Sequence, residues 1–337
     1  MKNLFALLLL VACLGTACRD DFQLEADYQD IPVAYAYLET GASRQFVRVE
    51  KAFLQPGGDA LAIARIADSI YYGPDQASVF IERTDGSNRT QLQRVNGEDF
   101  TLNRVPGIFI EQPNVLYTFT NDEFALTGGN NVRLVIERPD ETPAEAVTSI
   151  IEPITIQVPS EDDPFINTRD FTRAITVRWD AGPQARVFDL RLYFQIREIF
   201  PQSPDQDQTV TLEWVINNAY VREDGSSRTV RLVIPNESFY QFLGNNLEPK
   251  NGVFRLLDGI DFQVTAVGSE IESLLQIAGA NAGITSSQAI PAFTNVSGGR
   301  GIVTSRSVDL VQGINLAAGD ARDSLRNSIY TRTLGFQ

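Results

Sequence analysis

The sequence predicts an all-β protein with two β domains. Apolar and polar residues alternate over long stretches, and a period of two is typical of strands that bury one face. Turn-forming runs separate these stretches, and many short strands joined by such turns are typical of sandwiches or barrels. Of the 337 residues, 43% are hydrophobic and 21% are charged, which indicates a folded chain large enough for two ordinary domains.

The N-terminus has the layout of a secretory signal. Lys2 is followed by an apolar run over residues 4–14, which is too short for a bilayer span of about 20 helical residues. Small residues precede both Cys13 and Cys18, so each cysteine fits a lipoprotein signal-peptidase site. We expect lipidation at Cys18, because this choice leaves the longer apolar core. Cys13 is the alternative, and an ordinary cleaved signal with a leftover cysteine is a third reading.

Two sets of strands follow, one in each half of the chain. In the first half we expect strands at residues 31–38, 45–54, 78–84 and 131–137. In the second half the clearest alternation runs over residues 185–199, where Phe188, Leu190 and Leu192 fall on one face. The same period predicts further strands through Ile175, Val177 and Trp179; Val210, Leu212, Trp214 and Ile216; Val230, Leu232 and Ile234; and Phe262, Val264 and Ala266.

Two helices interrupt the second set of strands. Ser269 and Glu272 have the spacing of a capping box, and an apolar stripe follows until Gly279 ends the helix. A shorter helix begins at Asn236 and stops at Gly244. We expect both apolar stripes to cover a sheet rather than to form a ligand groove.

An acidic stretch bracketed by Pro159 and Pro164 divides the two sets of strands and reads as a linker. We therefore expect a lipoprotein signal peptide at residues 1–17 and a tether at 18–30. A tether of a dozen extended residues reaches about 40 Å from the lipid. The first β domain then covers residues 31–158, the linker 159–170, and the second β domain with its helices 171–337.

The composition excludes most catalytic chemistry. There is no histidine, so the familiar serine and cysteine triads, His-ligated zinc and His-ligated haem are excluded. Neither Lys51 nor Lys250 lies in a Gly-x-x-x-x-Gly-Lys phosphate loop. Because 43 acidic residues outnumber 28 basic ones, we expect no nucleic-acid partner.

Carboxylate chemistry is what remains, as paired acids for glycosidic bonds or as calcium ligands. Asp205 and Asp207 have the alternate spacing of a calcium loop, but the Gly and the distant Glu of such a loop are missing. A solvated hairpin tip explains these two residues without a ligand. We therefore assign no catalytic residue, no metal and no cofactor, and we expect that the protein is not an enzyme.

The most distinctive run after the signal covers residues 293–303. Gly298, Gly299 and Gly301 allow the backbone to approach closely or to turn through positive φ. This property suits either contact with a ligand or a tight crossover of the chain. As a candidate binding loop we single out Asn295, Gly298, Gly299, Arg300 and Gly301.

The run from Phe293 to Ile302 resembles the C-terminal motif of an uncharacterised family of outer-membrane lipoproteins from the Bacteroidota, although Val303 replaces that family's usual aromatic residue. Similarity continues at Phe46-Val47-Arg48-Val49 and from Tyr117 to the segment 144–153, which resembles the last strands of an immunoglobulin-like domain. The resemblance implies two β-sandwich domains, the first immunoglobulin-like and the second β-rich with one or two short covering helices. Arg19-Asp20-Asp21 resembles the acidic surface-export signal of such lipoproteins, which favours Cys18.

The family's members are often encoded near TonB-dependent transporters. The resemblance therefore implies a surface-exposed outer-membrane lipoprotein that assists nutrient capture, as a binding or docking accessory of such a transporter, with the ligand unidentified. The alternative is a structural or adhesive surface lipoprotein without a ligand pocket. Ser69 and Ser324 lie in Asp-Ser-aliphatic tripeptides that resemble the O-glycosylation sites of these bacteria.

Overall fold

The computed structural model describes residues 30–52, 59–223, 227–281, 293–317 and 319–337. Strands make up 45% and helices 15% of the protein, which confirms the prediction of a mainly β fold with a few short helices. The predicted signal peptide, most of the tether, Cys13 and Cys18 lie outside the described residues. Within the described part of the chain, no helix combines the length and the apolar character needed to cross a membrane.

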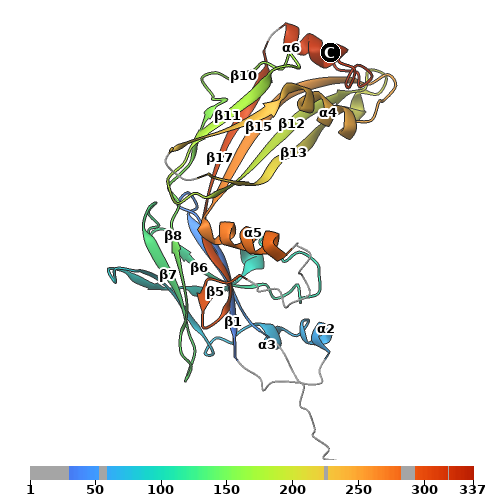
Figure 1. Cartoon of the computed structure of the whole chain (residues 1–337). Helices are drawn as coiled ribbons and strands as arrows, with labels where there is room; N and C mark the ends of the chain where they lie inside the picture. Colours follow the sequence, from blue (N-terminus) through green and yellow to red (C-terminus); the bar gives the residue numbers. More distant parts are fainter. Residues whose placement is uncertain (1–29, 53–58, 224–226, 282–292, 318) are drawn as a thin grey trace, which may run out of the picture.

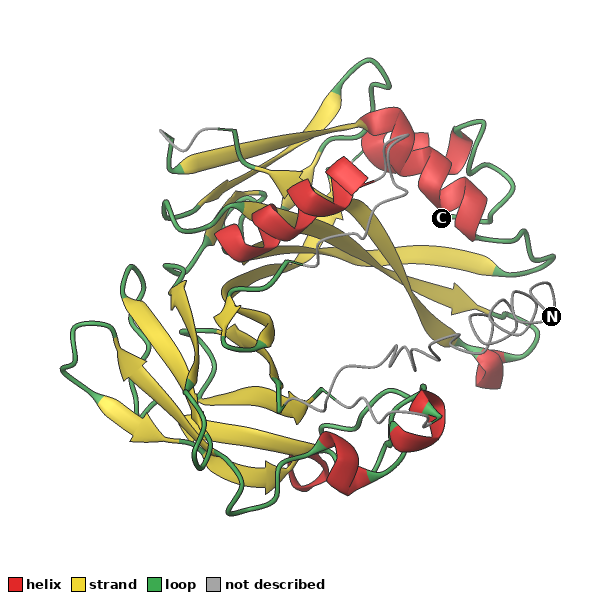
Figure 2. Ribbon diagram, turned by 60° about the horizontal axis from the view of Figure 1, so that its bottom comes forward, coloured by secondary structure: helices red, strands yellow, loops and turns green. Residues whose placement is uncertain are grey.

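The strands form three sheets (Figures 1 and 2). The largest has nine strands, which are, in spatial order, β13 (Gln208–Val221), β12 (Val187–Ile199), β15 (Phe254–Val267), β17 (Arg300–Leu316), β1 (Pro32–Leu38), β2 (Arg44–Lys51), β6 (Val115–Thr120) and β5 (Gln93–Asn96), with β10 (Phe165–Ile166) paired to β17 off this path. The smallest contains β14 (Thr229–Pro235), β11 (Ala174–Asp180) and β9 (Thr155–Val158). The third contains β16 (Val296–Ser297), β8 (Ala144–Ser149), β7 (Asn131–Glu137), β3 (Ser78–Arg83) and β4 (Arg89–Gln91).

Helices lie at the borders of these sheets (Figure 2). They are α2 (Ala60–Ile63), α3 (Ala67–Ile70), α4 (Asn236–Asn246), α5 (Ser269–Asn281) and α6 (Asp320–Asn327), with short 3-10 turns η1 (Gly97–Phe100) and η2 (Pro204–Gln206). α4 and α5 begin where the sequence predicts. α5 runs past Gly279, and Glu272 forms two hydrogen bonds with Arg186 instead of reaching back to the start of its helix.

Most buried apolar side chains gather in two large clusters, which define two lobes, and a small third cluster contains Ile70, Tyr71 and Val115. The first lobe (residues 30–52, 59–150 and 293–305) buries residues from β1, β2 and β6 together with residues from β3, β7 and β8. The second lobe (residues 151–223, 227–281, 306–317 and 319–337) buries residues from β12, β15 and the C-terminal half of β17 together with residues from β9, β11 and β14. The lobes meet along one side, so that the molecule is C-shaped with α5 on its concave side (Figure 1).

β17 belongs to both lobes and makes their large sheet continuous. Its first residues, Arg300 to Ser305, run parallel to β1, and its next residues, from Arg306 to Ile314, run antiparallel to β15. Two segments therefore lie in a different lobe from the one that the predicted domain bounds gave them. β16 and the start of β17 join the first lobe, and β9 joins the second. Pairing between strands so far apart in the chain leaves no signal in local sequence.

Polar side chains of β17 bind the backbone that connects β8 to β9. Ser305, Ser307 and Asp309 alternate along the strand, so their side chains point to the same face. They accept hydrogen bonds from the amides of Ile151, Ile154 and Ile156 at 3.0, 3.1 and 2.6 Å respectively. This row fixes the chain at the point where it passes from the first lobe to the second.

Candidate functional site

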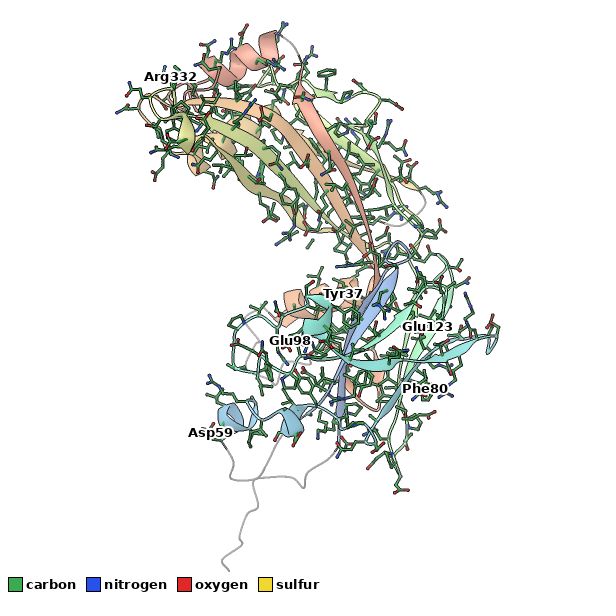
Figure 3. All side chains as sticks on the ribbon, turned by 180° about the vertical axis from the view of Figure 1, so that it is seen from behind. Tyr37, Asp59, Phe80, Glu98, Glu123 and Arg332 are labelled. Atoms are coloured by element: carbon green, nitrogen blue, oxygen red, sulfur yellow. The ribbon has the colours of Figure 1, made fainter. Side chains whose placement is uncertain are left out.

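The candidate site lies on the outer face of the large sheet in the first lobe. β1 alternates buried and exposed residues because Ala34, Ala36 and Leu38 face the core. Tyr35 and Tyr37 therefore point outward, and they remain 48% and 52% exposed. Tyr37 lies on the concave side of the molecule, whereas Phe80 and Glu123 lie toward the opposite flank (Figure 3).

These tyrosines line an open cavity of about 340 Å³, which we call the aromatic groove. Phe46 and Arg48 from β2 also line it, together with Arg44 at the start of β2 and Arg306 from β17. Glu39 lines the cavity as well, so the charge of the cavity depends on which of the three arginines are paired with acids.

Two of the three arginines are neutralised by acidic neighbours. Arg48 lies 3.1 Å from a carboxylate oxygen of Glu50, and Arg306 lies 2.9 Å from one of Glu39. Both side chains are thereby held in place at the border of the aromatic groove.

Arg44 differs, because no carboxylate of the described residues forms an ion pair with it. Its guanidinium carbon lies 5.1 Å from the centre of the Phe100 ring, and Nη1 donates to Thr118 Oγ1 at 3.5 Å. Phe100 in turn packs edge-on against Phe46, with the ring centroids 5.3 Å apart. A guanidinium held by an aromatic ring keeps most of its donors available for an anionic group.

α5 borders the same face of the sheet and is anchored by its two glutamates. Glu270 accepts a hydrogen bond of 2.8 Å from Thr304, which lies next to Tyr37 in the register of β17 and β1. Glu272 binds Arg186 at 2.7 Å, and the hydrogen bonds from Arg186 lower the pKa of this carboxyl. The concave side therefore has a fixed border beside the tyrosines.

The candidate binding loop of residues 295–301 has a packing role in the structure. Asn295 binds both the amide and the carbonyl of Val303, at 3.0 and 2.7 Å. Gly301 has φ of 109°, and a side chain there would overlap the carbonyl oxygen of Ala34. Gly298 also has positive φ, and Gly299 lies close to the carbonyl of Pro32. Arg300 is exposed. Binding by this loop stays a prediction, whereas its close approach to β1 is a feature of the fold.

The other single residues from the sequence lie apart from the aromatic groove. Ser324 is on α6, where it donates to the carbonyl of Arg169 at 3.4 Å and lines a separate open cavity of about 620 Å³. Ser69 is half-buried on α3. Asp207 accepts a hydrogen bond of 2.7 Å from the amide of Phe200 and so closes a hairpin. Within the described part of the chain, no three acidic or cysteine side chains gather as metal ligands would.

Sequence reasoning missed the aromatic groove. Residues 33–37 read Val-Ala-Tyr-Ala-Tyr, so both faces of this strand carry apolar or aromatic side chains. Two tyrosines at alternate positions, opposite small alanines, were the signal that could have marked an exposed aromatic face.

Comparisons with known proteins find only low similarity. No family model matches the chain, and no curated protein matches it. Among solved structures, the C-terminal globular domain of an oligosaccharyltransferase from Pyrococcus abyssi is 10% identical with a TM-score of 0.24, covering 68% of this chain and 42% of that one. The FN1–FN3 domains of chicken CNTN1 are 7% identical with a TM-score of 0.20, covering 70% and 61%.

A bacterial ice-binding adhesin of 1.5 MDa is 10% identical with a TM-score of 0.18, covering 86% of this chain and 67% of that one. These likenesses are too low to carry an argument about activity or partners.

Proposed function

We propose that this protein is a surface-exposed, lipid-anchored outer-membrane protein whose aromatic groove binds a ligand. In this proposal it assists nutrient capture, as a binding or docking accessory of a TonB-dependent transporter. The observation that carries the binding role is the groove itself, where exposed tyrosines and Arg44 meet in a cavity of about 340 Å³. The anchor rests on the signal sequence and on Cys18.

The groove favours one class of ligand. Tyr35 and Tyr37 offer flat apolar rings that end in hydroxyl groups, which suits contact with a flat apolar surface. Arg44 lies over the Phe100 ring, and although Glu123 interacts with it electrostatically, the structure gives it no hydrogen bond to a carboxylate of the described residues. The ligand in this proposal therefore carries a carboxylate, sulfonate or other anionic group beside a flat apolar face.

The proposal includes two β-sandwich domains, the first of them immunoglobulin-like. Each apolar cluster draws side chains from two different sheets, as the layers of a sandwich do. The lipid anchor leaves the first of these domains nearer to the membrane, because β1 directly follows the tether.

The anchor is tested by replacing each cysteine separately and following the protein through membrane fractionation. Cys18→Ala should abolish incorporation of labelled fatty acid and release the protein from the outer membrane, while Cys13→Ala should leave both unchanged. Loss of labelling in Cys13→Ala alone would move the anchor to Cys13. A protein found only in the soluble periplasm in all three forms would refute the proposal.

The transporter role is tested by purifying the tagged, lipidated protein from its native membrane in mild detergent. A TonB-dependent transporter recovered in stoichiometric amount, and identified by mass spectrometry, is the expected result. Recovery of surface polymers without a transporter would instead support the second candidate function.

That second candidate is a structural or adhesive surface protein, and the junction of the lobes favours it. The continuous sheet and the row of Ser305, Ser307 and Asp309 give the molecule a fixed shape, as a spacer requires. A cell that carries Tyr35→Ala with Tyr37→Ala would distinguish the two functions. Growth on limiting nutrients should fall if the groove captures a ligand, and should not change if the protein is a spacer.

A further inference from the structure

β13 is the edge strand at one end of the large sheet, and β5 is at the other end (Figure 1). Its inner edge pairs with β12, and among the described residues no strand pairs with its outer edge. Proteins commonly protect such an edge by a short strand, a lysine or a proline. β13 is 14 residues long, Gln208–Val221, and its sequence contains neither lysine nor proline. Its register with β12 is regular from Gln208 to Val215, and bulges, which also protect edges, occur only between Val215 and Tyr220.

The side chains of β13 are also incompletely covered. None of its residues is buried, whereas β12 beside it buries every second residue. Four apolar side chains of β13 pack against the second core but stay partly exposed, namely Leu212, Trp214, Ile216 and Tyr220. Val215, on the other face, is 42% exposed. Phe242 of α4 stacks on Trp214, with the ring centroids 4.9 Å apart, but the margin of the second core stays partly exposed along this strand.

Charge does not protect the edge either. Glu213 is the only ionisable acid or base in β13, and it is paired with Arg191 of β12. Arg191 also binds Asp189, so these groups form one compact cluster on β12 and its neighbour. Although the whole chain has a net charge of −15, this cluster of one arginine and two acids carries a net charge of only −1.

We propose that a second copy of this chain pairs with this edge, β13 against β13 in antiparallel orientation. In an antiparallel pair, directly opposite residues point to the same face. β13 alternates Val210, Leu212, Trp214 and Ile216 with Thr209, Thr211 and Glu213. The apolar set of one copy therefore meets the apolar set of the other, and a two-fold axis satisfies both edges at once.

This self-complementarity distinguishes a second copy from an unrelated strand. The pairing joins the large sheets of two molecules and covers the partly exposed margin of each second core. One strand pair buries little surface, so the contact is weak, with a Kd on the order of micromolar in solution. Anchoring both copies in one membrane raises their effective concentration and favours the pair.

Cysteine cross-linking in intact membranes tests the proposal on the full chain. Single cysteines are placed at Thr209, Thr211, Glu213, Val215 and Asn217, and the membranes are oxidised with copper phenanthroline. A disulfide requires Cα atoms within about 7 Å of each other. For a two-fold pair, dimer yield should therefore peak at one residue, or at two adjacent positions of this series, and fall on both sides.

The matched control is Val233→Cys on β14, the edge of the smaller sheet, where the valine is 48% exposed. We expect the peak position in β13 to give at least about fivefold more dimer than this control, since its Cα atoms meet across the axis. Equal yields along β13 and at β14, or cross-linking only to a protein of different mass, would overturn the proposal.

Discussion

At the scale of single residues, the second lobe contains a buried ion pair. The side chains of Glu198 and Arg255 are each 1% exposed, and Arg255 Nη2 lies 2.7 Å from Glu198 Oε1. Arg255 also donates to the carbonyl oxygens of Leu334 and Glu248, at 2.8 and 2.9 Å. The pair therefore ties the C-terminal segment to the large sheet.

Replacing one partner of this pair should be strongly destabilising. Arg255→Met leaves Glu198 buried with Lys250 as its remaining cation, and we expect a loss of about 3 kcal/mol in the free energy of unfolding. Arg197→Met is the control, because Arg197 pairs with Asp258 at the surface and such pairs contribute about 0–1 kcal/mol. Urea denaturation of both variants checks this, and equal losses would contradict it.

The same carboxyl predicts a dependence of stability on pH. Burial raises the pKa of Glu198, but hydrogen bonds from Lys250, Gln208 and Arg255 outweigh burial and hold the pKa at about 2. Because this pKa lies below the unfolded value of 4.5, the stabilisation is complete above pH 4.5 and is lost as pH falls toward 2. The full effect amounts to about 3 kcal/mol.

Unfolding by urea at several pH values between 6 and 2 measures it. The wild-type free energy of unfolding should fall by about 3 kcal/mol more than that of Glu198→Gln over this range. Parallel curves for the two proteins would show that Glu198 does not carry the effect.

In the aromatic groove, Arg44 should determine the binding of anionic ligands. The probe is 8-anilinonaphthalene-1-sulfonate, which carries a sulfonate beside flat rings. We expect it to bind about tenfold more weakly to Arg44→Gln than to the wild type, which is equivalent to ~1.4 kcal/mol of binding free energy. Arg83→Gln is the control, since Arg83 also lies over a phenylalanine ring but outside the groove. Fluorescence titration measures both, and an equal change in the two variants would point to unspecific binding.

At the scale of single elements, β17 depends on glycine at one position. An alanine side chain at Gly301 would overlap the carbonyl of Ala34, and its φ of 109° is already unfavourable for other residues. We expect Gly301→Ala to lower the free energy of unfolding by about 3 kcal/mol or more. Gly313→Ala, in the same strand with φ of 69° but no atom near its Cβ position, should cost only about 1 kcal/mol. Thermal unfolding of both variants separates overlap from backbone strain.

The elements also show what local sequence can and cannot predict. Strands with strict alternation, such as β12, and helices with an apolar stripe, such as α4, are predicted within a few residues of their bounds. α6 was missed because only Ala321 and Leu325 supply its buried apolar contacts within a mostly polar segment. The glycines of residues 298–301 stand out in the sequence, but β1, the strand that they approach, lies far away in the sequence. The aromatic groove escaped prediction for the same reason, since its arginines and tyrosines come from three strands.

At the scale of the whole molecule, the two lobes share one strand and are joined by polar contacts. β17 gives its first half to the core of the first lobe through Val303 and its second half to the other core through Val311 and Ile314. Loss of β1 would remove a pairing partner from residues 300–305 of β17, directly beside the residues that pair with β15, and we expect this to weaken that second pairing. We therefore expect the lobes to unfold together, as one cooperative unit.

Both tryptophans of the chain, Trp179 and Trp214, lie in the second lobe, so tryptophan fluorescence reports on that lobe alone. Ile81 is fully buried in the first lobe, and Ile81→Ala should cost about 2–5 kcal/mol by leaving a cavity. If the lobes unfold together, this change lowers the urea midpoint seen by fluorescence as much as that seen by circular dichroism. Ile196→Ala in the second lobe is the matched control and lowers both midpoints in either case. The opposite result is that Ile81→Ala leaves the fluorescence midpoint unchanged while circular dichroism shows an additional transition at lower urea. This result would show that the lobes unfold separately and that β17 transmits no stability between them.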